Sequence, residues 1–151
     1  MYLGGVEMSV GENLKRLFSL EGKVIILTGA AGGIGSALAK GLASVGADMV
    51  LCDIAMDPLH EVEKEIQESG DKAKSFELDV MSMKSIKACV DAVMKHYGKI
   101  DVLINCAGIN KREGFLDVEE DTYDRLMAIN LKGAFFLSQE VAKHMMKVRR
   151  G

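Results

Sequence analysis

The chain has 151 residues, the length of one domain, and 48% of them are apolar, which is enough to build a hydrophobic core. Its formal net charge of −3 provides no electrostatic attraction to nucleic acid or to an anionic membrane surface, so we expect neither as a partner. The three cysteines have no paired or metal-like spacing, and neither a secretory signal nor a long apolar run appears near the start, which favours a cytoplasmic protein with reduced thiols and no metal.

The first part of the chain predicts an extension followed by alternating strands and helices. Residues 1–20 are expected to form an N-terminal extension with an amphipathic segment at 13–20. The first strand is predicted at 23–28 and the second at 48–53. Between them, the helical pattern at 33–45 predicts a buried face made of Ile34, Leu38, Leu42 and Val45.

A second helix is predicted after the second strand. It is expected to begin with Asp57 as the N-cap and Pro58 in the first helical position, and to end at Gly70. Its spacing of apolar residues places one face against the core. That face consists of Leu59, Val62 and Ile66.

The remaining elements complete an alternating order. They are a strand at 74–80, a helix at 83–97 that ends at Gly98, a strand at 100–105 and a long helix at about 120–150. Strands that alternate with helices of this length pair in parallel through right-handed crossovers. Strands that are apolar along their whole length fit a sheet covered on both faces. The sequence therefore predicts a doubly wound α/β fold.

A glycine-rich segment joins the first predicted strand to the first predicted helix. Glycine permits a positive φ and a close approach of the backbone to a pyrophosphate, and the start of a helix supplies free N–H groups for that anion. A tight turn without any ligand is the alternative, but the strand before it and the helix after it favour phosphate binding. The predicted cofactor-binding residues in this segment are Gly29, Gly32, Gly33, Ile34 and Gly35.

An acidic residue stands at the end of the second predicted strand. Asp53 lies 18 residues after Gly35, where a carboxylate can accept hydrogen bonds from the hydroxyl groups of an adenosine ribose. The same charge repels a 2′-phosphate, and no Arg or Lys in the glycine segment or just after Asp53 offsets it. We therefore expect NAD(H) rather than NADP(H) as the cofactor, with Ile54 also in contact with it.

Four segments together resemble the short-chain dehydrogenases/reductases. Residues 28–35 resemble the T-G-x-x-x-G-x-G motif of this family, and Asp79-Val80 resembles its D-V pair. Residues 105–108 resemble its N-N-A-G motif, with Cys106 in place of the second Asn. Residues 130–133 resemble its N-x-x-G element, and the four motifs occur in the order that the family shows.

The resemblance implies a Rossmann dinucleotide-binding domain over residues 21–151, with its sheet truncated after the fourth strand–helix unit. It places Asp79 and Val80 at the adenine, and Asn130 in a catalytic role, at a helix distortion where it holds a water of the proton relay. A helix-capping Asp79 and an ordinary turn at the fourth strand remain as alternatives. The residues of that strand end implied to line the cofactor are Asn105, Ala107 and Gly108.

The resemblance also implies hydride transfer between the nicotinamide and a carbonyl or alcohol carbon, with a Ser and a Tyr-x-x-x-Lys pair as acid–base groups. None of the three tyrosines is followed four residues later by Lys. We therefore expect a fragment of an NAD-dependent oxidoreductase that is inactive alone. The alternatives are a non-catalytic module that binds nucleotide or self-assembles, and an extended sugar-nucleotide epimerase, which shares the glycine loop.

Substrate and partners are less constrained by the sequence. The segment 107–112 resembles family members that act on sugar acids such as gluconate, and the cations Lys111 and Arg112 would suit a carboxylate. A solvated loop, 3-oxoacyl reduction or oxidation of a secondary alcohol are the alternatives. The fourth strand is predicted to form an apolar sheet edge, so we expect a homo-oligomer that associates through this strand or the last helix.

Overall fold

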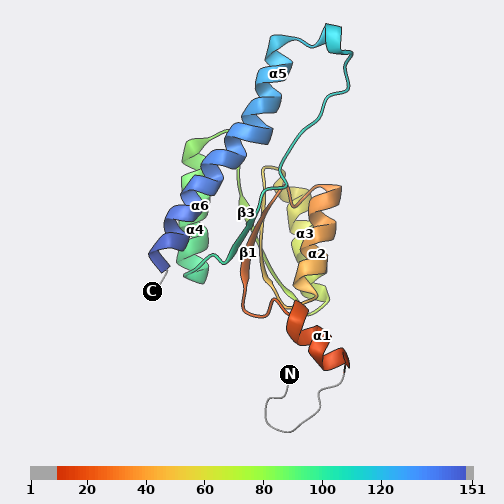
Figure 1. Cartoon of the computed structure of the whole chain (residues 1–151), viewed down its shortest axis with the longest axis vertical. Helices are drawn as coiled ribbons and strands as arrows, with labels where there is room; N and C mark the ends of the chain where they lie inside the picture. The colour runs from red at the N-terminus through yellow and green to blue at the C-terminus, as the bar shows by residue number, and fades with distance from the viewer. Residues whose placement is uncertain (1–9, 149–151) are drawn as a thin grey trace.

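Four parallel strands form one sheet in the order β3-β2-β1-β4, and helices cover both of its faces (Figure 1). The computed structural model describes residues 10–148. The strands are β1 (Val24–Thr28), β2 (Asp48–Asp53), β3 (Lys72–Glu77) and β4 (Val102–Ile104). The helical elements are α1 (Val10–Phe18), α2 (Gly33–Ala43), α3 (Met56–Glu68), α4 (Met83–Tyr97), η1 (Phe115–Asp117), α5 (Glu120–Met127), η2 (Ala128–Gly133) and α6 (Ala134–Val148). This architecture confirms the predicted doubly wound fold.

The central strands are buried on both faces because successive side chains point to opposite sides of the sheet. Ile26, Val50 and Cys52 belong to a core cluster that includes residues of α4 and α6. Ile25 and Leu51 belong to a second cluster with residues of α2 and α3. The two helical layers in Figure 1 therefore each cover a continuous apolar surface.

The register brings the carboxyl ends of the strands to one edge of the sheet. Thr28 at the end of β1 lies opposite Cys52, and Leu27 lies opposite Ile104 at the end of β4. Because β2 continues to Asp53, this carboxylate stands next to the turn that follows β1. In parallel α/β sheets, ligands bind outside this edge, where the connections diverge.

The predicted buried face of the first helix is wrong. The residues of α2 that face the core are Gly35, Ala39 and Ala43, whereas Ile34 is 74% exposed. A Cβ on Gly35 would overlap the carbonyl oxygen of Gly29, so the rotation of α2 is fixed with Gly35 toward the sheet. As a result of this rotation Leu38 is exposed and Leu42 is only partly buried. Val45 lies beyond the end of α2 and is exposed as well.

Further boundaries differ from the prediction, and β4 covers only Val102–Ile104 of the predicted strand at 100–105. The helix α3 begins at Met56 with Ala55 as its N-cap, because the amide of Leu59 donates its hydrogen bond to Ala55. The predicted capping residues therefore lie inside its first turn, where an aspartate still suits the helix dipole and a proline lacks an amide that needs a partner. The strand β3 ends at Glu77 instead of residue 80 because the chain turns after it.

The predicted long helix is interrupted. Between α5 and α6, the segment η2 has the wider winding of a π-helix. Gly133 lies against the loop after β3, and a Cβ at this position would come 2.8 Å from the carbonyl oxygen of Val80. The helix distortion that the family resemblance implied near Asn130 is therefore present. The residues predicted at 149–150, and those at 1–9 of the N-terminal extension, lie outside the described part of the chain.

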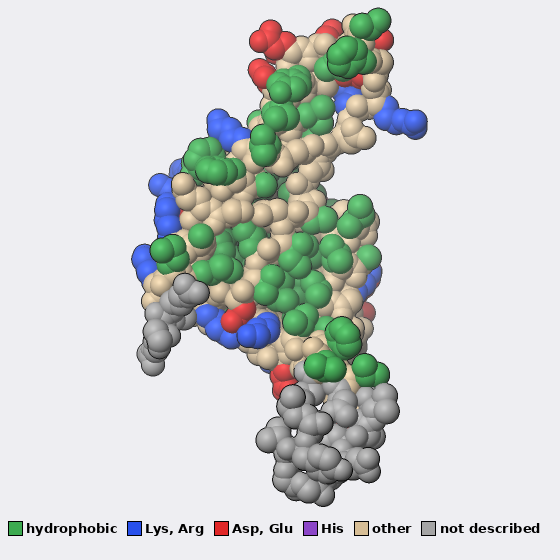
Figure 2. All heavy atoms as spheres, in the orientation of Figure 1, with side chains coloured by type: hydrophobic (Ala, Val, Ile, Leu, Met, Phe, Trp, Pro, Cys, Tyr) green, Lys and Arg blue, Asp and Glu red, His purple; other side chains and the backbone are tan. Residues whose placement is uncertain are grey.

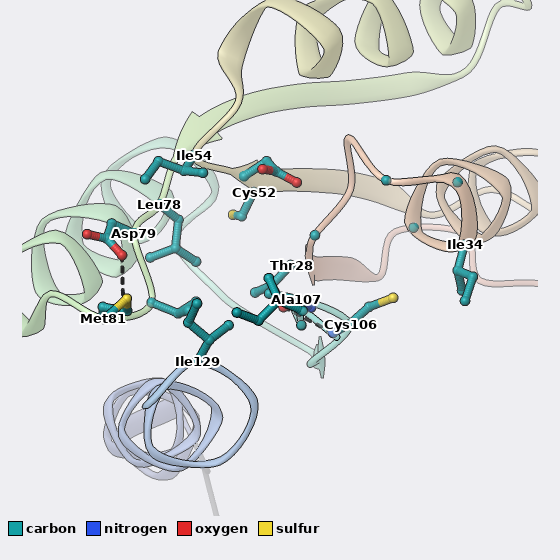
Figure 3. Close-up of a pocket in the computed structure, with 18 of the residues that line it drawn as sticks. Thr28, Ile34, Cys52, Ile54, Leu78, Asp79, Met81, Cys106, Ala107 and Ile129 are labelled. Atoms are coloured by element: carbon teal, nitrogen blue, oxygen red, sulfur yellow. Dashed lines mark hydrogen bonds between the residues drawn. The ribbon is translucent and has the colours of Figure 1, made fainter. Parts of the chain in front are cut away.

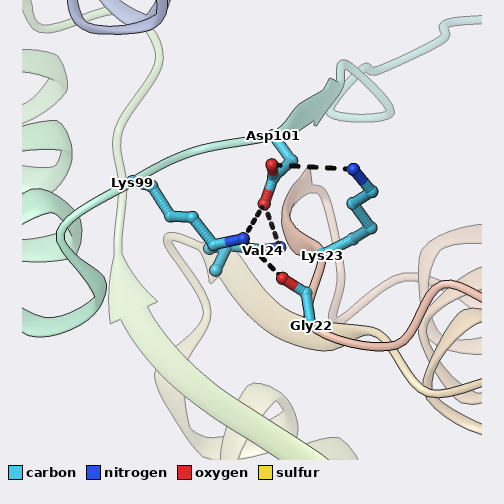
Figure 4. Close-up of polar contacts among 5 residues, drawn as sticks. All are labelled: Gly22, Lys23, Val24, Lys99 and Asp101. Carbon is cyan, nitrogen blue, oxygen red and sulfur yellow. Dashed lines mark hydrogen bonds and ion pairs between the residues drawn. The ribbon is translucent and has the colours of Figure 1, made fainter. Parts of the chain in front are cut away.

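A carboxylate holds the amino ends of β1 and β4 together, at the edge of the sheet away from the glycine loop (Figure 4). Asp101 accepts a 2.8 Å hydrogen bond from the amide of Val24 and pairs with Lys99 at 2.8 Å and Lys23 at 4.0 Å. Lys99 also donates to the carbonyl of Gly22. Burial of the carboxyl opposes its ionisation, but the hydrogen bonds from Lys99 and Val24 and the two lysine charges outweigh it and lower the pKa of Asp101.

We expect Asp101→Asn to lower stability at about pH 7 by about 1 kcal/mol, because the amide cannot pair with the two lysines. The lowered pKa means that the ionised carboxylate stabilises the fold above the unfolded pKa of about 3.9, and that this contribution disappears as the pH falls through the folded value. Urea unfolding at several pH values measures the difference. Asp91→Asn on the exposed side of α4 is the control. A stability difference between the Asp101→Asn variant and the unsubstituted chain that persists at about pH 2 would contradict the assignment.

Candidate functional site

A cavity of about 510 Å³ lies at the carboxyl ends of the strands, between the glycine loop, the ends of β2 and β3, and η2 (Figure 3). Its walls come from segments that are far apart in the sequence. All of the predicted cofactor-binding residues except Asn105 line it, namely Gly29, Gly32, Gly33, Ile34, Gly35, Asp53, Ile54, Asp79, Val80, Ala107 and Gly108. The fold therefore brings the glycine loop, the strand-end acid and the family-like motifs to one site.

The glycine loop is tight toward the protein and open toward the cavity. Gly29 has a φ of +68°, and a Cβ there would lie 2.8 Å from the Cα of Ala107. The amide of Gly32 donates to the carbonyl of Gly29 at 3.1 Å and closes the turn. In contrast, a Cβ at Gly33 would meet nothing within 4 Å. The first N–H groups of α2 have no partner within the helix, so the loop can present them to an anion.

Asp53 links the end of β2 to the glycine loop. One carboxylate oxygen accepts a hydrogen bond from the amide of Ala31 at 3.1 Å, and the other accepts one from the amide of Ala55 at 3.1 Å. These bonds hold the carboxylate at the cavity wall. Each carboxylate oxygen has a second lone pair, so the group can still accept hydrogen bonds from a ligand hydroxyl.

Asp79 shapes the turn after β3. Its carboxylate accepts a 2.9 Å hydrogen bond from the amide of Met81 (Figure 3). Its own backbone amide donates to the hydroxyl of Ser85 at 2.9 Å. The N-cap of α4 is Ser82, whose hydroxyl accepts from the amide of Ser85. The alternative that Asp79 caps this helix is therefore wrong, and Val80 continues the cavity wall beside it.

Thr28 holds the chain that leaves β4 against the end of β1. Its hydroxyl accepts hydrogen bonds from the amides of Cys106 and Ala107, both at 3.0 Å. Thr28 is 1% exposed and lines the cavity, but it was not predicted as a site residue. Asn105 lies outside the lining residues, and its side-chain nitrogen donates to the hydroxyl of Ser138 on α6 at 3.0 Å.

Asn130 fastens the loop after β4 to η2. Its side-chain oxygen accepts from the amide of Ile109 at 2.9 Å, and its side-chain nitrogen donates to the carbonyl of the same residue at 2.9 Å. The two bonds satisfy both backbone groups of Ile109, which lines the cavity. Asn130 does not line the cavity itself, whereas its neighbour Ile129 does.

Asn130→Ala should therefore release this loop. We expect a loss of about 1 kcal/mol in the free energy of unfolding, because the Ile109 backbone loses two hydrogen bonds at an exposed position, where water can replace them in part. Urea unfolding measures the loss, and faster hydrogen exchange at the amide of Ile109 locates it. Asn110→Ala is a matched control, since Asn110 is exposed one residue further along the same loop. Unchanged exchange at Ile109 in the Asn130 variant would contradict the clamp.

The cations expected to suit a sugar acid do not lie in the cavity lining. Lys111 pairs with Glu113 and donates to the hydroxyl of Thr122 at 3.2 Å, so its charge is already compensated. Arg125 of α5 lines the cavity instead, and in the described part of the chain it has no hydrogen bond or ion pair. The helical spacing of Arg125 and Ile129 was the available signal for this wall, but the sequence does not show that α5 reaches the site.

The described tyrosines are poor acid–base groups for this site. Burial, followed by the charges of Asp48 and Glu63, raises the pKa of Tyr97 to about 12, and this last residue of α4 packs against the core. Tyr123 is 55% exposed on α5 and does not line the cavity. Among residues 10–148, no group of three or more His, Cys, Asp and Glu is placed to hold a metal ion. The same residues include no helix that is long and apolar enough to cross a membrane.

Comparisons of the sequence agree with this geometry. A family model described as short chain dehydrogenase matches residues 23–151. A 3-oxoacyl-(acyl-carrier-protein) reductase of Thermotoga maritima is 39% identical, and the match covers 87% of this chain and 54% of the length of that relative. A 2-dehydro-3-deoxy-D-gluconate 5-dehydrogenase of Escherichia coli is 37% identical (89% and 52%), and a gluconate 5-dehydrogenase of Gluconobacter oxydans is 38% identical (89% and 53%). The chain spans about half the length of the curated relatives it matches.

Solved structures resemble the fold closely. A short-chain dehydrogenase/reductase of Mycobacterium marinum matches 95% of this chain and 57% of its own, with a TM-score of 0.87 and 31% identity. A xylitol dehydrogenase with bound NAD⁺ matches 84% of this chain and 49% of its own, with a TM-score of 0.81 and 36% identity. A metagenomic short-chain oxidoreductase in complex with NADP matches 87% and 60%, with the same TM-score and identity. The similar structures thus include complexes with both nicotinamide cofactors.

Proposed function

Since the chain belongs to the short chain dehydrogenase family, we propose that it forms the NAD(H)-binding part of an oxidoreductase that acts on a carbonyl or alcohol carbon. One observation carries the proposal: the glycine loop and the Asp53 carboxylate border the same cavity and are hydrogen-bonded to each other through Ala31. A helix start suits a pyrophosphate, and a strand-end carboxylate suits the ribose beside it.

The preference for NAD(H) over NADP(H) rests on charge. A 2′-phosphate would have to approach the Asp53 carboxylate, and the residues that follow it, Ile54 to Met56, offer no cation. The glycine loop contains no Lys or Arg either. Because like charges at close range in a partly buried site cost free energy, the site favours the cofactor with a free 2′-hydroxyl.

Each wall of the cavity receives a role under this proposal. The glycine loop and the start of α2 bind the pyrophosphate, and Asp53 with Ile54 binds the adenosine ribose. Asp79 and Val80 border the adenine, and Ala107 with Gly108 keeps the backbone close to the nicotinamide side. The bound cofactor supplies or accepts the hydride. Asn130 positions the loop at Ile109 and, as in the family resemblance, belongs to the proton-relay machinery.

The chemistry of proton transfer is not provided within these 151 residues, where no Tyr is followed four residues later by Lys. We therefore propose that the chain alone binds cofactor without turnover. For the substrate we propose a sugar acid, because two of the relatives are named for gluconate compounds and because Arg125, which lines the cavity, is a cation without a partner in the described residues. We also propose a cytoplasmic location, where nicotinamide cofactors are available to the site.

Calorimetric titration with NADH and, separately, with NADPH tests the cofactor proposal. We expect NADH to bind at least about 10-fold more tightly, from the repulsion at Asp53. Bound NADH should also slow alkylation of Cys106, which is half-buried and lines the cavity. Equal affinities would contradict the NAD assignment, and binding of neither cofactor would contradict the proposal as a whole.

We further propose that the chain associates with itself. The strand β4 lies at the edge of the sheet, and its three apolar side chains are only half-buried. Hydrophobic side chains are also exposed on the projecting segment that carries α5 (Figure 2), and Phe135 of α6 is 61% exposed. An unpaired apolar edge favours pairing with a second chain. A monodisperse monomer in light scattering at micromolar concentration would contradict this proposal.

A further inference from the structure

Two of the three cysteines meet in the core beneath the cavity. Cys52 is the second-last residue of β2, and Cys89 lies in the middle of α4. Their sulfur atoms are 3.7 Å apart, although 37 residues separate them in the sequence. Cys52 is fully buried and Cys89 is 5% exposed, whereas Cys106 lies elsewhere, after β4.

The pair connects the cofactor cavity to the opposite helical layer. Cys52 lines the cavity, and its carbonyl accepts a hydrogen bond from the amide of Ala30 in the glycine loop at 3.3 Å. Cys89 lies within the apolar cluster that α4 and α6 form against the sheet. A bond between the two sulfurs would therefore join the end of β2, next to Asp53, to α4.

The surroundings distinguish the two thiols. The hydrogen bond with Cys89, burial and the neighbouring charges of Cys89 and Asp53 raise the pKa of Cys52. The hydrogen bond from Cys52 lowers the pKa of Cys89 against the opposing effect of burial. Cys89 is thus the thiol that ionises first, and Cys52, which lines the cavity, remains a protonated neighbour. This is the division between an attacking and a resolving cysteine.

We propose that Cys52 and Cys89 form an oxidation site that hydrogen peroxide converts to an intramolecular disulfide. The Cys89 thiolate attacks one peroxide oxygen, the O–O bond breaks, and hydroxide takes up a proton to leave as water. The sulfur of Cys52 then attacks the resulting sulfenic acid, its thiol proton leaves with the hydroxyl group as a second water, and the S–S bond forms. Two thiols lose two electrons in total, and the peroxide gains them.

The required movement is small. A disulfide has an S–S distance of about 2.05 Å, so the sulfurs must approach by less than about 2 Å, which side-chain rotation and a slight shift of α4 can provide. Because the bond closes a loop of this length, it should raise the midpoint of thermal unfolding, by on the order of 5 °C, if it is formed without strain. A thiol reductant should reverse the change.

The experiment treats the folded chain with hydrogen peroxide, then denatures it and alkylates the remaining thiols. The Cys106→Ala variant keeps Cys52 and Cys89, and peroxide should leave it without an alkylatable thiol. Its mass should fall by two hydrogen atoms, and a non-reducing digest should contain a cross-linked Cys52–Cys89 peptide. Cys89→Ala and Cys89→Ser remove one partner and should give no such peptide. The unsubstituted chain should form mainly the Cys52–Cys89 bond when it is folded. In urea it should lose this selectivity, since its three thiols then meet at random.

Several results would overturn the proposal. Two alkylatable thiols in the peroxide-treated Cys106→Ala chain would show that the pair only fills the core. Cross-linked peptides of the unsubstituted chain that contain mainly Cys106, or disulfides that join two chains, would assign the oxidation to another site. None of these outcomes depends on cofactor binding, so the oxidation site and the proposed function are tested separately.

Discussion

Replacing Gly35 by alanine is expected to abolish cofactor binding, with an affinity at least about 100-fold lower, and to lower the free energy of unfolding by about 3 kcal/mol. The added Cβ would overlap the carbonyl oxygen of Gly29 and come within 2.9 Å of the Cα of Ala30. Relief requires movement of the backbone at Gly29, which itself packs against Ala107. The loop would then no longer direct the first N–H groups of α2 into the cavity.

Gly41→Ala is the matched control for this prediction. Gly41 lies further along α2, and a Cβ there would meet nothing within 4 Å. Alanine is preferred over glycine inside a helix by about 0.5–1 kcal/mol, so this variant should be as stable as the original chain or more stable, and should bind NADH normally. Thermal unfolding and NADH calorimetry of the unsubstituted chain and the two variants measure both effects. Normal NADH affinity in the Gly35 variant would remove the glycine loop from the proposed site.

The order of the elements could be predicted from the sequence, but the buried face of α2 could not, and Gly35 explains the difference. Strand and helix patterns depend on local periodicity, and β2 and α4 have the predicted boundaries. The large residues of α2 follow a helical period as well, but its rotation is set by the contact of Gly35 with Gly29. Periodicity selects the largest apolar residues, whereas close packing at the loop requires the smallest ones.

A comparable limit applies to the site. The glycines of the loop and the acid at the end of β2 could be placed from the sequence alone, because their position directly after a strand indicates their role. The hydroxyl of Thr28 bonds to amides 78 and 79 residues away, and Arg125 reaches the cavity from a helix outside the sheet layers. Asn105 was expected at the cofactor, but the structure directs its amide to Ser138. Such contacts depend on which distant segments meet, and local patterns do not encode this.

Asp53 has two tasks in the proposed site. It holds the glycine loop through the amide of Ala31, and it presents a charge to the ribose position of the proposed cofactor. A substitution at this residue therefore affects both the shape of the loop and the choice between the two cofactors. Comparing alanine with asparagine separates the effects, since an amide oxygen can replace one hydrogen-bond acceptor but carries no charge.

Asp53→Ala is expected to weaken NADH binding by about 10- to 100-fold, because it removes a charged acceptor for the ribose and frees the amides of Ala31 and Ala55. Asp53→Asn should lose less NADH affinity, since its oxygen can still accept from one amide, yet it should gain NADPH affinity because the repulsion of the 2′-phosphate is gone. The ratio of the two affinities, measured by calorimetry, should fall toward one in both variants. Asp57→Asn, an exposed acid in the first turn of α3, is the control and should leave the ratio unchanged. If the ratio survives the loss of the Asp53 charge, the discrimination has another source, and Asp53 is only a support of the loop.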